Sequence, residues 1–296
     1  MTVAQIAQSA AFVQARAGHR FRIESRPADT EPVGTIVFVH GFAEELNKSR
    51  RMVALGARRL AADGWRVVQR DLHGCGDSAG DFADATWDAW AEDVQEEVLR
   101  ADRDRPAWLW CLRAGALLAA PAVAVRPDLR VLLWQPVLSG DQHLRQHLRL
   151  QAGARIVGSS KADAGASPLE RLRAGEQVEI GGYRIHPSLA AGMRAARFDV
   201  PPAFRGRMAW LEVSSQVEDG LAPSSAGVVE GLRVRGVDVQ TAVIAGPPFW
   251  QTQELTVSPE LVDRTAAIVD GPGGDGETSC ASAHAQSAPL AKEHAG

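Results

Sequence analysis

The chain has 296 residues, 45% of them hydrophobic, which is enough for one large α/β domain with a sizeable core and argues against wholesale disorder. The formal net charge of -4 lacks the basic excess typical of nucleic-acid-binding proteins. No apolar run approaches the roughly 18 residues that a membrane crossing needs, and the first residues do not resemble a secretory signal. Three scattered cysteines without metal-ligand spacing indicate a reducing compartment, so we expect a cytoplasmic protein.

Strand-like and helix-like segments alternate along the first half of the chain. An apolar run at 35–39 predicts a buried strand, and helical spacing over 48–63 follows it. The same alternation continues with a strand at 65–68, a helix at 86–103, a strand at 108–112, an alanine-rich helix at 114–125 and a strand at 130–137. This rhythm predicts an α/β fold with a mostly parallel sheet and helices on both faces.

The rhythm breaks over 139–205, which is polar, contains Gly and Pro, and includes a possible hairpin at 178–185. We interpret this stretch as a cap inserted over the edge of the sheet. The alternation then resumes with a strand at 208–213, a helix at 224–235, a strand at 239–244 and a helix at 259–270. The predicted organisation is an N-terminal extension at 1–19, a core formed by 20–138 and 206–270, the cap at 139–205 and a disordered tail at 271–296.

Three motifs occur in a characteristic order. The strand at 35–39 ends in His40-Gly-Phe42, and in acyl hydrolases the loop at this place gives a backbone N–H to the oxyanion hole. A glycine-rich turn at 71–80 follows the next strand, and we interpret it as structural. Cys111-Leu-Arg-Ala-Gly115 then joins a strand to a helix, with the small residues that a sharp nucleophile elbow needs. Together the three motifs predict the α/β-hydrolase fold.

The elbow carries arginine where the nucleophilic serine is expected. A guanidinium stays protonated near neutral pH, so Arg113 is not a nucleophile. Cys111 is an alternative nucleophile, although its side chain is expected to face packing. The acid would follow the strand at 208–213, where Glu218 and Asp219 lie. No histidine lies between the last strand and the last helix, so a Ser–His–Asp triad lacks both the serine and the base.

The cationic side chain of Arg113 lies at a predicted helix N-terminus, where the helix dipole disfavours a cation by roughly 0.3–1 kcal/mol. A nearby anion would offset this cost. One possibility is an internal ion pair with Glu44 or Glu45, and the other is a ligand carboxylate or phosphate held bidentately. Glu44 could alternatively act as a general base toward water if burial raises its pKa. Trp250 would lie over the mouth of the pocket, as a wall or as lid packing.

The candidate site residues fall into two groups. The candidate catalytic residues are Arg113, Glu44 and His40. The candidate oxyanion and pocket residues are Gly41, Phe42, Ala114, Glu45 and Trp250. The i, i+4 pair His143 and His147 has no third ligand near it in the sequence, so we expect no metal and no cofactor.

Three segments of the chain resemble the type 2 exosortase A system-associated hydrolases. They are the runs at 40–52, 111–115 and 246–251, and the resemblance covers roughly residues 20–270. It implies an α/β-hydrolase fold, a bacterial cytoplasmic protein, and a link to exopolysaccharide production and PEP-CTERM protein sorting. The family also carries arginine at the elbow, whereas Cys111 here replaces the glycine expected at that position.

Three functions remain open. The protein could be a hydrolase or acyltransferase for esters or thioesters that uses Arg113, Glu44 and the oxyanion N–H groups. It could be a non-catalytic protein that binds an anionic or carrier-bound acyl ligand through Arg113. It could also be a scaffold for other proteins of the exopolysaccharide system. The loss of two triad members argues against simple serine hydrolysis and makes Arg113 the predicted centre of an anion-handling site.

Overall fold

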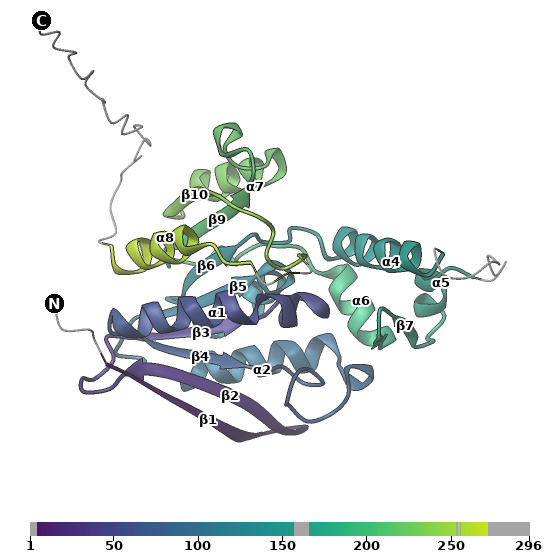
Figure 1. Cartoon of the computed structure of the whole chain (residues 1–296), viewed down its shortest axis with the longest axis horizontal. Helices are drawn as coiled ribbons and strands as arrows, with labels where there is room; N and C mark the ends of the chain where they lie inside the picture. Colours follow the sequence, from purple (N-terminus) through teal and green to yellow (C-terminus); the bar gives the residue numbers. More distant parts are fainter. Residues whose placement is uncertain (1–4, 157–165, 253, 255, 272–296) are drawn as a thin grey trace, which may run out of the picture.

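An eight-stranded sheet forms the centre of the structure, a computed structural model that describes residues 5–156, 166–252, 254 and 256–271 (Figure 1). Its strand order is β1-β2-β4-β3-β5-β6-β9-β10. The strands are β1 (Ile6–Ala15), β2 (Gly18–Pro27), β3 (Thr35–Val39), β4 (Arg66–Arg70), β5 (Ala107–Leu112), β6 (Arg130–Trp134), β9 (Met208–Ser214) and β10 (Val239–Ala245). The six strands from β3 onward run parallel to one another, and β2 pairs antiparallel with both β1 and β4, which confirms the predicted mostly parallel sheet.

Helices cover both faces of the sheet, because successive residues of the central strands point to opposite faces and are apolar on both. Ile36 of β3 packs with α1 (Glu44–Ala62) and α8 (Pro259–Asp270) on one face. Val37, the next residue, faces the opposite layer, which contains α2 (Trp87–Arg100), α3 (Ala119–Val125) and α7 (Pro223–Val234). Burial on both faces explains why the central strands read as continuous apolar runs.

The predicted elements of the core are confirmed with small shifts at their ends. The strand expected at 130–137 ends at Trp134. The alanine-rich helix after the elbow begins as a 3₁₀ helix, η2 (Arg113–Leu118), before α3. These differences are of the size expected where helix and strand ends are judged from patterns.

The first two strands were not predicted from the sequence. Residues 1–19 were expected to form an extension, and in the structure β1 and β2 form an antiparallel hairpin in which β2 pairs with β4 of the main sheet. Most of β1 is exposed at the edge of the sheet, so its sequence lacks the apolar alternation that marks a half-buried strand. The described residues from 6 to 15 therefore form the edge strand of the main sheet.

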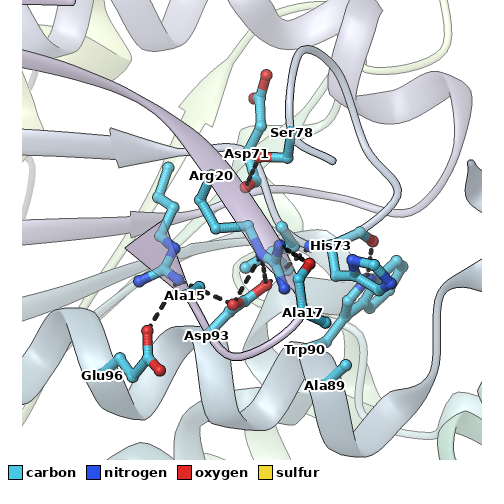
Figure 2. A network of polar contacts seen from close by, with 12 residues as sticks. Ala15, Ala17, Arg20, Asp71, His73, Ser78, Ala89, Trp90, Asp93 and Glu96 are labelled. Atoms are coloured by element: carbon cyan, nitrogen blue, oxygen red, sulfur yellow. Dashed lines mark hydrogen bonds and ion pairs between the residues drawn. The ribbon is translucent and has the colours of Figure 1, made fainter. Parts of the chain in front are cut away.

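A buried cluster of charged side chains ties the hairpin to the core (Figure 2). Arg20 of β2 and Arg70 of β4 both donate to the carboxylate of Asp93 in α2, over N···O distances of 2.8–2.9 Å. The backbone N–H of His73 donates to the same carboxylate. All three charged side chains are only 2–3% exposed. The cluster therefore joins three elements that are distant in the sequence.

The segment between β6 and β9, which we call the cap segment (140–195), stands at one end of the sheet (Figure 1). Its elements are α4 (Gly140–Ile156), α5 (Pro168–Arg173), the predicted hairpin of β7 (Val178–Ile180) and β8 (Tyr183–Ile185), and α6 (Pro187–Ala195). Residues 272–296, nearly all of the predicted tail, lie outside the described residues. Among the described residues, no helix has the length and apolar character that a membrane crossing requires.

Candidate functional site

The sharp turn expected of a nucleophile elbow is present, with arginine at its tip. Strand β5 ends at Leu112, and Arg113 has a φ of 53°, in the left-handed region that side chains with a Cβ disfavour. Gly115 lies so close to β3 that a Cβ at this position would come within 2.6 Å of the carbonyl oxygen of Val39. The turn therefore has the backbone shape expected of an elbow, with Arg113 at its tip.

Arg113 forms an ion pair with Glu45 of α1. Its Nε lies 3.0 Å from Glu45 Oε1, and the two side chains are 14% and 13% exposed. Nη1 donates to the carbonyl oxygen of Gln135 at 3.4 Å, and the guanidinium lies 5.1 Å from the ring centre of Trp250. Of the two anions considered for Arg113, the internal carboxylate is therefore present, and it comes from Glu45. Glu44 instead accepts a hydrogen bond from the hydroxyl of Tyr183 in the cap segment.

The carboxylate of Glu45 also lies on the loop that was expected to form the oxyanion hole. Its Oε2 accepts the backbone N–H of Phe42 at 3.2 Å. A Cβ at Gly41 would come within 2.9 Å of Glu45 Cβ and Oε2, so glycine is needed for this close approach. The chain's own carboxylate thus takes the N–H that would stabilise the charge of an acyl-transfer intermediate.

Backbone strain gathers around this ion pair. In the part of the chain that the structure describes, the non-glycine residues with positive φ are Ala43, Arg113 and Gln135. Ala43 is the N-cap of α1 directly before Glu44 and Glu45, and Gln135 accepts the hydrogen bond from Arg113. Such conformations cost about 1–3 kcal/mol each and cluster at functional sites, which supports a functional role for this place.

A cavity of about 290 Å³ opens beside the ion pair. Its lining residues are Phe42, Glu44, Glu45, Lys48, Arg113, His143, Gln146, His147, Trp250 and Gln251. Apart from the three from α4, they all come from the segments 40–52, 111–115 and 246–251. The three segments singled out in the sequence therefore meet at one cavity.

Two histidines of α4 complete the wall, a position that the sequence pattern did not indicate. His143 Nε2 lies 3.8 Å from Glu45 Oε2. Burial lowers the pKa of His143 to about 4, with Glu45 opposing this effect and Arg113 adding to it. Burial also lowers the pKa of His147, again against the effect of Glu45. Both rings are therefore neutral near pH 7, and within the described ranges neither Nε2 has a hydrogen-bond partner.

The i, i+4 spacing of the two histidines was the only signal of this face in the sequence, and without a third ligand near the pair no metal site was predicted there. In the described residues, no group of three His, Cys, Asp or Glu side chains is placed to hold a metal ion. The position of His143 of α4 beside Glu45 in the first turn of α1 depends on how the cap segment folds, and helical spacing alone does not show it.

Three residues of the candidate set lie away from the cavity or lack the surroundings expected of them. His40 is buried behind the loop: its Nε2 accepts the N–H of Leu72 at 3.3 Å, and Nδ1 lies 2.8 Å from the carbonyl oxygen of Gly41. Burial lowers its pKa, so His40 is a neutral structural residue and the expected catalytic contact is absent. Glu44 is exposed, so the burial required for a general base is absent. Ala114 is buried and does not line the cavity.

The remaining triad candidates also lie elsewhere. Cys111 is fully buried, and burial raises the pKa of its thiol, so it is not a reactive nucleophile. Glu218 and Asp219 are exposed in η3 (Val217–Asp219) and do not line the cavity. Where a triad histidine would follow β10, the chain instead brings Trp250 against Arg113.

The glycine-rich turn at 71–80 is structural, as predicted. Asp71 Oδ2 accepts the backbone N–H of Asp77 across the turn, and Gly74, Gly76 and Gly80 have positive φ. None of these residues lines the cavity beside Arg113.

Known proteins share this architecture. The sequence matches the family described as serine aminopeptidase, S33, over residues 30–174. No curated protein matches the chain at the level of sequence. Among solved structures, Est1E from Butyrivibrio proteoclasticus with bound ferulic acid has a TM-score of 0.58 at 17% identity, covering 88% of this chain and 97% of that one. A carboxyl esterase from Bacillus coagulans has a TM-score of 0.57 at 16% identity, covering 89% and 98%.

The thioesterase domain of the curacin biosynthetic pathway also has this fold, with a TM-score of 0.51 at 15% identity over 89% of this chain and 99% of that one. At such low identities these likenesses concern the fold, and they do not carry over an activity. The sheet order, the elbow and the family match agree. The chain has the α/β-hydrolase fold.

Proposed function

We propose that this protein binds a small ligand in the cavity beside Arg113 and does not carry out serine-hydrolase chemistry. The Arg113–Glu45 ion pair at the tip of the elbow is the observation that carries this proposal. An acyl hydrolase needs a nucleophile at that tip and free N–H groups for the oxyanion. Here the tip is a cation, and the N–H of Phe42 is already bonded to Glu45.

The chemical groups around the cavity support binding. Among its described lining residues there is no serine, threonine or cysteine that a neighbouring histidine could activate. His143 and His147 are neutral and lie close to the ion pair, but they have no hydroxyl or thiol beside them to deprotonate. The cavity thus has polar side chains that can bind a ligand, but its described lining residues include no hydroxyl or thiol nucleophile.

The charge balance changes the expected role of Arg113. Its charge is matched by Glu45, so a ligand does not have to supply a negative charge. In the described part of the chain, Nη2 of Arg113 has no hydrogen-bond partner, and this edge of the guanidinium can donate to a ligand acceptor. A bidentate clamp on a ligand carboxylate, as considered from the sequence, would compete with Glu45.

A hydrolysis screen tests the proposal that acyl-transfer chemistry is absent. Esters and acyl-thioesters of several chain lengths would be incubated with the wild type, Arg113→Ala and Glu44→Ala. We expect all three proteins to release product at the rate of buffer alone. Product formed by the wild type and lost in Arg113→Ala would contradict the proposal.

A second candidate function, hydrolysis of an ester or thioester by an activated water, is favoured by the position of His143 next to Glu45. A carboxylate beside an imidazole can orient it as a base. The pKa of His143, lowered by burial to about 4, makes it a weak base. Turnover in the same screen that disappears in His143→Gln would favour this candidate.

The resemblance to exosortase A system-associated hydrolases leads us to propose a cellular location and partner proteins. We would place the protein in the bacterial cytoplasm, where it would bind its ligand for proteins of exopolysaccharide production. Co-purification from a native host under mild conditions tests this. Recovery of no protein of that system would count against the setting and would leave the ligand-binding role untouched.

A further inference from the structure

The cavity beside Arg113 differs from an acyl-chain pocket in the side chains that it offers. Its two aromatic residues, Phe42 and Trp250, are only 1% and 4% exposed, so their rings contribute little open surface. All other described lining residues are polar or charged: Glu44, Glu45, Lys48, Arg113, His143, Gln146, His147 and Gln251. Small-molecule pockets are usually lined mainly by hydrophobic side chains. An acyl chain here would remove water from charged groups without replacing their hydrogen bonds, which is costly.

The charges of the wall argue against a strongly charged ligand as well. Two carboxylates, Glu44 and Glu45, and two cations, Lys48 and Arg113, face the same small space. A phosphate would approach both carboxylates, and an ammonium group would approach both cations. Lys48 Nζ donates to the carbonyl oxygen of Gln251, and Arg113 is paired with Glu45, so the charges are largely satisfied within the wall. A neutral ligand meets this surface with the least repulsion.

Three of the lining side chains have polar atoms that the protein does not satisfy. The Nε2 atoms of His143 and His147 and the indole Nε1 of Trp250 are buried and have no hydrogen-bond partner among the described residues. His143 is more than nine-tenths buried and contacts the cavity beside Glu45. Most buried polar atoms in proteins have a partner, so the packing around these side chains is not complete without a further group.

Hydroxyl groups suit this wall better than any other common group. Carboxylates only accept hydrogen bonds, Lys and Arg only donate them, and amides and neutral imidazoles do both. A hydroxyl can donate to Glu44, accept from Arg113 Nη2, and do either with the amides of Gln146 and Gln251. A ligand with several hydroxyls can therefore pair with all of these groups at once.

We infer that this cavity binds a neutral, hydroxyl-rich ligand, chemically a mono- or disaccharide. The inference rests on the proposed ligand-binding function and names the class of ligand. The volume of about 290 Å³ lies near the lower end of the roughly 300–1,000 Å³ usual for small-molecule pockets, which suits a ligand of one or two sugar rings.

Ligand-observed NMR and calorimetry with defined probes test the inference. The probes are glucose, galactose, N-acetylglucosamine and maltose, with butyrate, an octanoyl thioester and inorganic phosphate as comparison ligands. We expect saturable binding of at least one saccharide to the wild type. Gln251→Ala should weaken it by up to about tenfold, because one hydrogen bond is worth about 0.5–1.5 kcal/mol. Gln251 is exposed, so this variant should fold normally.

Gln216→Ala is the matched control, since Gln216 is also an exposed glutamine but does not line the cavity. It should bind the saccharide like the wild type. Absence of binding by every saccharide, or tighter binding of phosphate or of an acyl probe, would overturn the inference. Tight binding of an acyl probe without hydrolysis would still leave the proposed function standing. Hydrolysis that depends on Arg113 would instead overturn the proposed function.

Discussion

Two arginine–carboxylate sites in this molecule differ in how far their side chains are shielded from solvent. In the cluster of Figure 2, Asp93 accepts from Arg20, Arg70 and a backbone N–H, and these side chains are 2–3% exposed. In the elbow, Arg113 and Glu45 are several times more exposed and face a cavity. The first site uses its charges to join β2, β4 and α2, and the second leaves polar atoms available.

The comparison shows that a buried ion pair does not by itself mark a functional site. The Asp93 carboxylate has no capacity left for a ligand, because each of its oxygens already accepts two hydrogen bonds. The Arg113 site has residues with positive φ around it and a cavity of about 290 Å³ beside it. Strain and the adjoining cavity therefore separate the candidate site from the structural cluster. Unpaired polar atoms do not separate them, since Arg70 Nε and Nη1 in the cluster also lack hydrogen-bond partners.

Substitution of Asp93 in the buried cluster should change the stability of the protein the most. Asp93→Asn removes the charge that balances two buried guanidinium groups, and breaking such a pair costs about 3–5 kcal/mol. Urea unfolding should show a loss of this size in the free energy of unfolding. Glu92→Gln, a change at an exposed neighbour on the same helix, is the control and should lose less than about 1 kcal/mol. Equal losses in the two variants would remove the distinction between the sites.

The second effect is a pH dependence of the free energy of unfolding, which arises from His143 beside the Arg113–Glu45 pair. The pKa of His143 falls from 6.5 to about 4 on folding, so the unfolded chain binds more protons between these values. The contribution of His143 is therefore fully present above pH 6.5 and is lost as the pH falls toward 4. Between pH 7 and pH 5 the loss should be about 2 kcal/mol.

Urea unfolding at both pH values checks this expectation. His143→Gln, which cannot titrate, should lose correspondingly less stability on acidification than the wild type. His19→Gln, at an exposed histidine, should behave like the wild type. If His143→Gln lost as much unfolding free energy between pH 7 and pH 5 as the wild type, burial of the His143 ring would not be the cause of the pH dependence.

The smallest effect concerns the strained backbone of the elbow. Both Arg113→Gly and Arg113→Ala remove the ion pair with Glu45, but only glycine adopts the φ of 53° without strain. The glycine variant should therefore be more stable than the alanine variant by about 1 kcal/mol, measured by urea unfolding. An alanine variant as stable as the glycine variant would mean that the elbow relaxes once the arginine is gone.

The sequence was sufficient for most of the fold. Apolar runs such as 35–39 and 108–112 are buried on both faces, so their strands could be read directly. Strand β1 could not, because an exposed edge strand has no buried face to leave a pattern. The predicted α/β-hydrolase architecture was thus correct, while the hairpin that opens it was missed.

The site was predictable only in part. Arg113, Glu45 and Trp250 follow from the elbow and from loops at fixed places in this fold, and they do line one cavity. The hydrogen bond from the backbone N–H of Phe42 to the carboxylate of Glu45 depends on the positive φ of Ala43, which no sequence pattern predicts. His143 reaches the site from the cap segment, whose position over the sheet is set by tertiary packing.

We propose that the ion pair at the elbow leaves this cavity to bind a ligand without acyl transfer. A single-turnover experiment tests it most directly: excess protein is mixed with a labelled acyl ester or thioester, and intact compound and product are quantified over time. We expect the compound to remain intact at the rate of buffer alone with the wild type. Rapid conversion by the wild type, lost in Arg113→Ala, would contradict the claim.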